Sequence, residues 1–190
     1  MNHQFKTPAI YNLLAHLKQH FPYKTSIIDT YSHNFSDIDL SKQNHNQTIQ
    51  ETFQQELNLI TGETVYIVWN IDSIIQHVKS SHQIPILTPV CELVQCAHLN
   101  NSSWTAALPN VSKHSNQKFN HKTDYIILAE LLYFPGLTII DGNHRFCEAL
   151  LSKQKNIKCL FLNPSYAHVF LQPDSNRFVS LFNNLMSLLM

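Results

Sequence analysis

We predict an α+β (α/β) fold for this chain of 190 residues, and three observations support the prediction. Short apolar runs rich in β-branched residues, such as Val65–Trp69 and Ile157–Leu162, indicate buried strands. Stretches with helical periodicity, such as Ile71–Val78 and Phe178–Leu189, alternate with them. A chain of this length can bury a sizeable core, so we expect residues 1–190 to form a single domain.

The composition restricts the classes of function. Charged residues make up 14% of the chain and the formal net charge is zero, so the charge does not indicate nucleic acid as a partner. No apolar run is long enough to span a membrane, and the segment Met1–Lys6 lacks the apolar centre of a signal peptide. We therefore predict a cytoplasmic protein without a membrane partner.

The first third of the chain predicts a helical N-terminal extension over residues 1–62. Thr7 and Pro8 are typical of a helix start, and leucines and an isoleucine follow at helical spacing. Ser26–Tyr31 has the pattern of a short strand. Thr48 and Glu51 form a capping box, which predicts a second helix that runs to a stop at Gly62.

The remaining elements form a predicted core over residues 63–162 and a C-terminal helix over residues 163–190. Within the core we expect a turn at Pro135-Gly136 and strand, helix and strand over 137–162, joined as a parallel crossover. The other expected elements are a strand at 65–69, a helix from residue 71, an extended segment at 85–89, a helix at 90–98 and a strand at 125–132.

A polar stretch from Asn100 to Thr123 has almost no pattern. Segments of this length inside a compact domain are often functional, so we predict an irregular lid beside the turn described next. For Trp104, near its start, we favour an aromatic anchor over a base-stacking role.

The stretch from Leu137 to Leu151 organises the chain. Leu137–Ile140 has the pattern of a buried strand, Asp141-Gly142 interrupts it, and apolar residues then recur at helical spacing. The N–H groups at a helix start and the helix dipole favour an anion, typically a phosphate. The strand-to-helix break therefore predicts an anion site.

Three polar side chains follow Gly142 at that break. Asn143 could cap the helix, while His144 and Arg145 place two donors at its start. A purely structural interpretation stays open, in which Gly142 supplies a permissive backbone, Asn143 caps and Arg145 pairs with a surface carboxylate.

The four cysteines show no C-x-x-C spacing. Cys147 and Cys159 lie in apolar contexts and are expected to be buried thiols. Cys91, Cys96 and His98 could be zinc ligands with His114 or His121 as the fourth, but the spacing matches none of the usual zinc patterns. We therefore predict no metal site formed by protein ligands alone.

The run Asp141-Gly142-Asn143-His144-Arg145 resembles the signature turn of the ParB/sulfiredoxin-like superfamily. The resemblance extends from about residue 84 to residue 162, under half of the chain. It implies a small mixed sheet with flanking helices, to which this chain adds N-terminal and C-terminal helices.

The branches of the superfamily imply different activities. In sulfiredoxin the catalytic cysteine lies just before His-Arg, where this chain has Asn143, and Cys147 does not replace it. ParB-like CTP-binding switches carry a further phosphate and metal motif, of which Asn176-Arg177 is the nearest match in a different context.

The form of the turn is most similar to that of free serine kinases. That resemblance implies that Gly142, Asn143, His144 and Arg145 hold phosphates and that Asp141 and His144 are catalytic, Asp141 by positioning a metal or an acceptor hydroxyl. The implied cofactor is a nucleoside di- or triphosphate with Mg²⁺. The other carboxylates that such enzymes need have only two candidates, Glu92 and Glu130.

Three functions follow as hypotheses. The first is a small nucleotide-dependent phosphotransferase, whose partner is a nucleotide or a small phosphorylated molecule. The second is a non-catalytic ParB-like module that senses nucleotides or accompanies nucleic acid. The third is an interaction protein with a vestigial site. A closed pocket with a carboxylate near His144 favours the first, a basic face beside the turn favours the second, and an Arg145 held in an internal ion pair favours the third.

Overall fold

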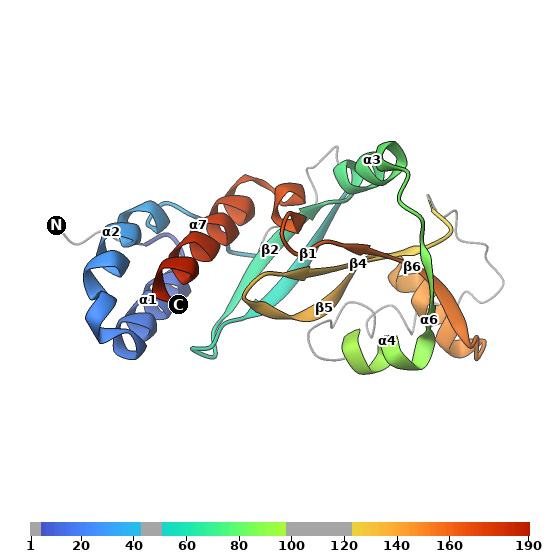
Figure 1. The fold of residues 1–190 in the computed structure, drawn as a ribbon, viewed down its shortest axis with the longest axis horizontal. Helices are drawn as coiled ribbons and strands as arrows, with labels where there is room; N and C mark the ends of the chain where they lie inside the picture. Colours follow the sequence, from blue (N-terminus) through green and yellow to red (C-terminus); the bar gives the residue numbers. More distant parts are fainter. Residues whose placement is uncertain (1–4, 43–50, 98–122) are drawn as a thin grey trace. The chain divides into compact units, whose positions relative to one another are not determined.

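A computed structural model of the chain describes residues 5–42, 51–97 and 123–190. The expectations for Thr48, for the lid, for Trp104 and for the zinc ligands His98, His114 and His121 lie outside the described residues. The chain divides into two compact units, residues 1–70 with 168–190, and residues 71–167. Figure 1 labels most of their helices and strands.

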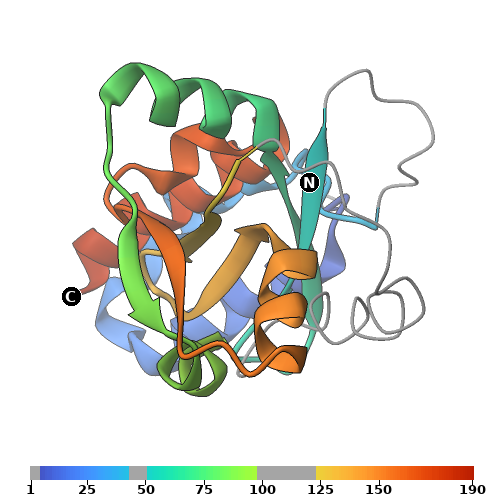
Figure 2. The same ribbon diagram turned by 90° about the vertical axis from the view of Figure 1, so that its right-hand side faces the viewer.

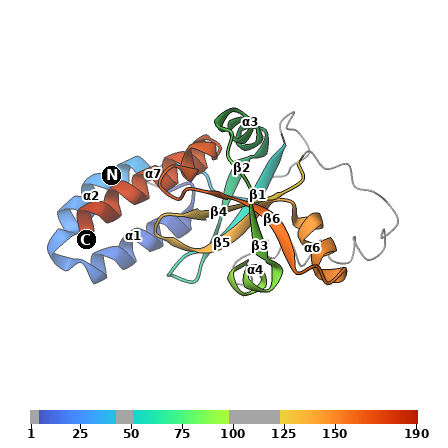
Figure 3. The same cartoon turned by 45° about the vertical axis from the view of Figure 1, so that its right-hand side comes forward.

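The first unit contains a group of helices. These are α1 (Pro8–His20), the 3-10 helix η1 (Pro22–Lys24), α2 (Thr25–Phe35) and α7 (Pro173–Leu189), which lie together in Figures 1 and 3. Helix α2 packs on both α1 and α7, with Ile28, Phe35 and Phe178 fully buried. The strand predicted at Ser26–Tyr31 is therefore wrong, because the buried residues follow the helical period.

The same unit contains a β-hairpin where the sequence predicts a helix. Strand β1 (Thr52–Asn58) pairs antiparallel with β2 (Thr64–Asn70). Gln55, Leu57 and Leu59 are buried at alternate positions, which is the period of a strand, and Gly62 serves the turn with φ +84°. The predicted helix to Gly62 is thus wrong, and the N-terminal extension is not wholly helical. The predicted boundaries at residues 62 and 162 stay predictions.

The second unit is built on a four-stranded mixed sheet, seen in Figure 2. Its strand order is β3-β6-β4-β5, with β4 parallel to β6 and the other pairs antiparallel. The elements in chain order are α3 (Ile71–Ser81), β3 (Ile86–Pro89), α4 (Val90–Ala97), β4 (Ile126–Leu131), β5 (Phe134–Asp141), α6 (Asn143–Leu151), β6 (Asn156–Leu162) and the start of the 3-10 helix η2 (Ala167–Phe170). The predicted α+β class is confirmed.

Helices α4 and α6 share one apolar core with the sheet. Val90 and Leu93 of α4 and Phe146, Cys147 and Ala149 of α6 are buried against residues of β4, β5 and β6. This core fixes the start of α6 against the end of β5.

The predicted order of strand, helix and strand over residues 137–162 is confirmed, but the parallel crossover is wrong. Strand β5 is antiparallel to β4, and β4 is parallel to β6, so β5 and β6 run in opposite directions on either side of β4. The parallel pair is β4 and β6.

The predicted turn at Pro135-Gly136 is also wrong. Leu131 pairs with Phe134, so the hairpin turns at Leu132-Tyr133, and Tyr133 has φ +64°. Between this pair and Ala129–Thr138, β5 holds two more residues than β4. Pro135 and Gly136 therefore belong to a bulge in β5, where Gly136 takes φ +124°.

In the part of the chain that the structure describes, no helix combines the length and apolarity needed to cross a membrane.

Candidate functional site

The turn between β5 and α6 is closed by a glycine that no other residue could replace without strain. Gly142 is the N-cap of α6 and has φ +94°, ψ +23°, in the left-handed region. A Cβ at this position would lie 2.7 Å from Ile126 Cγ2 and 3.1 Å from Ile126 Cα. The backbone of the turn is thus pressed directly against strand β4.

A bulge precedes this glycine. Ile127 pairs with Asp141 and Leu128 pairs with Ile139, so β5 carries one extra residue, Ile140, between the two pairs. Bulges redirect the neighbouring side chains and are common beside functional sites. The bulge here sets the direction of Asp141 at the entrance of the turn.

Arg145 lies within the turn, with its side chain only 10% exposed. Its Nη1 donates to the Thr123 carbonyl oxygen at 2.7 Å, to Thr123 Oγ1 at 2.6 Å and to the Tyr125 carbonyl oxygen. Its Nη2 donates to Asp141 Oδ2 at 3.0 Å, which forms an ion pair. The guanidinium group of Arg145 therefore connects the segment before β4 with Asp141 at the start of the turn.

Two polar atoms of this turn remain without a partner among the described residues. They are Arg145 Nε, a donor, and Asn143 Oδ1, an acceptor, and both are buried. Buried polar atoms in native proteins are hydrogen-bonded in the large majority of cases, and each exception requires an explanation such as a water, an ion or a ligand.

The start of α6 differs from the predicted cap. Asn143 is the first helical residue, Gly142 is the N-cap, and no described side chain makes a capping hydrogen bond. The prediction that Asn143 caps the helix is therefore wrong, although its place within one residue of the helix start is confirmed. The first N–H groups of α6 need partners from main chain, water or ligand.

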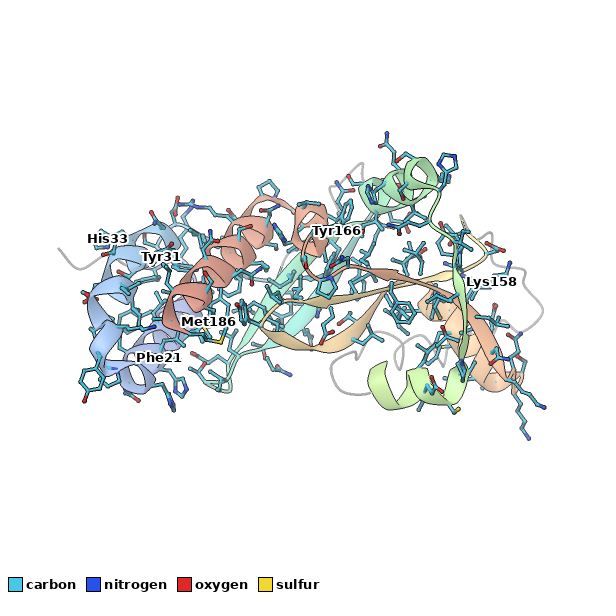
Figure 4. The ribbon with its side chains drawn as sticks, in the orientation of Figure 1. Phe21, Tyr31, His33, Lys158, Tyr166 and Met186 are labelled. Atoms are coloured by element: carbon cyan, nitrogen blue, oxygen red, sulfur yellow. The ribbon has the colours of Figure 1, made fainter. Side chains whose placement is uncertain are left out.

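The charges around the turn are balanced. Lys158 on β6, labelled in Figure 4, donates to Asp124 Oδ2 at 2.5 Å and holds the pKa of that carboxyl below its ordinary value. Burial raises the pKa of the Tyr125 phenol. Arg145 and Asp141 neutralise each other, so the positive charge of Arg145 is already compensated within the chain.

The predicted residues are only partly brought together. Asp141 and Arg145 meet, and Gly142 and Asn143 lie between them in the turn, with half-buried His144 adjacent. Glu130 lies three residues from Ile127 along β4, about 10 Å from the pair that Ile127 makes with Asp141. Glu92 is exposed in the first turn of α4, and no described contact joins either glutamate to the turn.

A cavity of about 310 Å³ in the second unit lies elsewhere. Its lining comes from the hairpin turn of β4 and β5 and from Pro164, not from the Asp141–Arg145 turn. Among the described residues, no three His, Cys, Asp or Glu side chains are grouped so that they could hold a metal ion.

Sequence reasoning missed the partners of Arg145. Thr123 and Tyr125 contribute mainly carbonyl oxygens, and Ile126 contributes the surface against which Gly142 packs. Every residue type has a main-chain carbonyl group, so the sequence does not show which carbonyl groups accept from Arg145. Only the pairing of strand β4 with β5 could have indicated these partners.

Cys147 and Cys159 are buried thiols, as predicted. Burial, reinforced by the Glu148 carboxylate, raises the pKa of the Cys147 thiol to about 11. A thiol in this state is a poor nucleophile, which agrees with the exclusion of Cys147 as a catalytic cysteine.

Comparisons with protein-family models, with curated proteins and with solved structures gave no significant match.

Proposed function

We propose that this chain is a ParB/sulfiredoxin-like protein that binds a nucleotide phosphate or another anion at the start of α6, without turning it over. The observation that carries the proposal is the pair of buried, unpartnered atoms, Arg145 Nε and Asn143 Oδ1, at a helix start without a side-chain cap among the described residues. An anion would accept from Arg145 Nε and the first main-chain N–H groups of α6, and a hydroxyl or water would donate to Asn143.

The role proposed for Arg145 differs from that of a phosphate clamp. Its two terminal nitrogens donate to Thr123, Tyr125 and Asp141. They are therefore not available to bind a phosphate in a bidentate manner. Arg145 is therefore a positioning residue that shapes the turn and offers a ligand only its Nε–H. His144 would be the additional side-chain donor to the anion.

Phosphoryl transfer has less support than binding. The carboxylate of Asp141 is paired with Arg145, and neither Glu92 nor Glu130 has a described contact with the turn. We therefore propose a nucleoside di- or triphosphate, with Mg²⁺ held mainly by its phosphates, as a bound ligand rather than as a substrate.

A cytoplasmic location is part of the proposal. Cys91, Cys147 and Cys159 are free thiols, which are typical of proteins in a reducing compartment.

The second candidate is an interaction protein with a vestigial site. The internal network of Arg145 favours it, because an arginine that holds a turn together needs no ligand to explain its presence. Under this alternative, the turn would bind neither phosphate nor nucleotide.

The test is a thermal-shift and calorimetric panel with inorganic phosphate, ATP, ADP and CTP, each with and without Mg²⁺. A ligand that binds only the folded chain raises its melting temperature. We expect binding by wild type and a loss of about 2- to 10-fold in affinity for His144→Asn, corresponding to one hydrogen bond.

The matched control is His82→Asn, an exposed histidine of the same unit whose Nδ1 lies 3.0 Å from the Ser80 carbonyl oxygen, and it should bind like wild type. If wild type binds none of these anions, the anion proposal fails and the interaction protein is the better account.

A further inference from the structure

Helix α1 carries two histidines one turn apart, His16 and His20. Their rings lie with centroids 4.3 Å apart and planes tilted by 47°. Positions i and i+4 share one face of a helix, which is the spacing at which paired histidines ligate a single metal ion in helical zinc sites.

One ring nitrogen of this pair lacks a partner. His16 Nε2 is buried and has no hydrogen bond to any described residue. A buried, unpaired imidazole nitrogen is costly, and a bound ion is one of the explanations for such an atom. His20 is exposed, so the second ring of the pair is open to an ion from solvent.

The distance between the rings favours some coordination geometries over others. With a metal–nitrogen bond of about 2.0–2.1 Å, the ring centroid lies roughly 3.2 Å from the ion. Two such rings are about 5.2 Å apart at a tetrahedral angle and about 4.5 Å apart at a right angle. The observed 4.3 Å is nearer to the right angle of square-planar or octahedral coordination.

The position on the helix also favours a cation. His20 is the last residue of α1 and His16 lies one turn before it. The carbonyl groups of the last helical turn carry partial negative charge, which stabilises a cation placed there.

We propose that His16 and His20 form a site at the end of α1 for a divalent transition metal, Ni²⁺ or Cu²⁺ in preference to Zn²⁺. Two imidazole nitrogens occupy adjacent positions of the ion, and water completes its coordination. No third His, Cys, Asp or Glu side chain of the described residues joins the pair, so the remaining positions stay open to an exogenous ligand. This site belongs to the unit of residues 1–70 and 168–190 and does not depend on the anion site.

The test is calorimetric titration of tag-free, full-length protein with Ni²⁺ and, separately, with Zn²⁺ at pH 7.5. Nickel avoids the oxidation that Cu²⁺ would cause at the exposed thiol of Cys91. We expect a binding step that is tighter for Ni²⁺ than for Zn²⁺, and a loss of at least about tenfold in the Ni²⁺ affinity of that step for His20→Ala.

The matched control is His33→Ala on α2 of the same unit, a histidine labelled with Tyr31 in Figure 4, which should keep the site. His20 is exposed, so circular dichroism should show His20→Ala folded like wild type. Unchanged Ni²⁺ binding by folded His20→Ala would overturn the proposal, as would an equal loss in His33→Ala. A site that prefers Zn²⁺ would overturn the assignment of the metal.

Discussion

At the scale of single residues, Gly142 is the most constrained position of the site. Its left-handed backbone disfavours any side chain, and the Cβ of an alanine would press on both a side-chain and a backbone atom of Ile126. Gly62 offers a natural comparison, because it has a similar φ of +84° but no atom lies within 4 Å of the place that a Cβ would take there.

We therefore expect Gly142→Ala to lower the free energy of unfolding by about 2–5 kcal/mol, the sum of backbone strain and overpacking. Gly62→Ala should lower the free energy of unfolding only through backbone strain, by about 1–2 kcal/mol. Urea denaturation of both variants measures the difference. Equal costs would contradict the close approach of Gly142 to Ile126.

Arg145 is the second residue whose role the structure redefines. Arg145→Lys keeps the charge but cannot reach Thr123, Tyr125 and Asp141 at once, so we expect a loss of about 1–3 kcal/mol in the free energy of unfolding. A double-mutant cycle with Asp141→Asn should show coupling between the two side chains.

The control for Arg145 is Arg177→Lys in the more exposed pair with Asp37, which should have little effect on stability. A fully stable Arg145→Lys variant would show that the internal network does not hold the turn.

Cys147 gives a pH-dependent prediction. Its folded pKa of about 11 lies above the ordinary value, so the folded state retains the thiol proton in a range where the unfolded chain loses it. Stability from this group is complete below the unfolded pKa and falls as the pH rises from about 9 towards 11.

We expect chemical denaturation at increasing pH to show this fall in wild type and a smaller fall in Cys147→Ala. Alkylation should follow the same order, with the exposed Cys91 modified well before Cys147 in the native protein. Rapid alkylation of native Cys147 would contradict its burial.

At the scale of elements, one hydroxyl joins the last helix to the hairpin of the same unit. Ser175 of α7 is 3% exposed, and its Oγ accepts from the N–H group of Val68 on β2 at 2.9 Å. The Ser175 hydroxyl thus accepts from a buried N–H group of β2 that points away from β1.

Ser175→Ala should lower the free energy of unfolding by about 1–3 kcal/mol, because it leaves the buried N–H group of Val68 unpaired. Ser187→Ala near the exposed end of α7 removes only a local bond to Asn184 and should change stability little. Thermal unfolding of the two variants compares them directly, and equal melting temperatures would show that the Val68 bond contributes nothing.

At the scale of the whole molecule, the first unit is assembled from both ends of the chain. Phe178, Leu185 and Leu189 of α7 are buried, and Lys24 Nζ donates to the carbonyl oxygens of Leu188 and Leu189. The N-terminal helices therefore lack part of their core until the last residues of the chain are in place.

Removal of residues 173–190 should abolish hydrogen-exchange protection in α1, α2 and the β1–β2 hairpin, while β4, β5 and α6 keep theirs. The reason is that the second unit has its own core, shared by α4, α6 and three strands. Exchange measured by mass spectrometry on the truncated and complete chains tests this, and protection of α1 in the truncated chain would contradict it.

The sequence by itself determined the elements whose signal is local. The strand and helix on either side of Gly142, the strand at 65–69 and the helix that follows it depend on apolar periodicity and on glycine, and they form where predicted. The α+β class follows from their alternation.

Only the tertiary structure decided the pairing of strands and the role of Arg145. The segment at 52–58 has apolar residues compatible with a helix, but its pairing with β2 makes it a strand, because β2 supplies the hydrogen-bond partners of one edge of its backbone. Arg145 likewise looks in the sequence like a free donor at a helix start. Its partners, the carbonyl oxygens of Thr123 and Tyr125, lie 22 and 20 residues earlier in the chain, and carbonyl groups are the same in every residue.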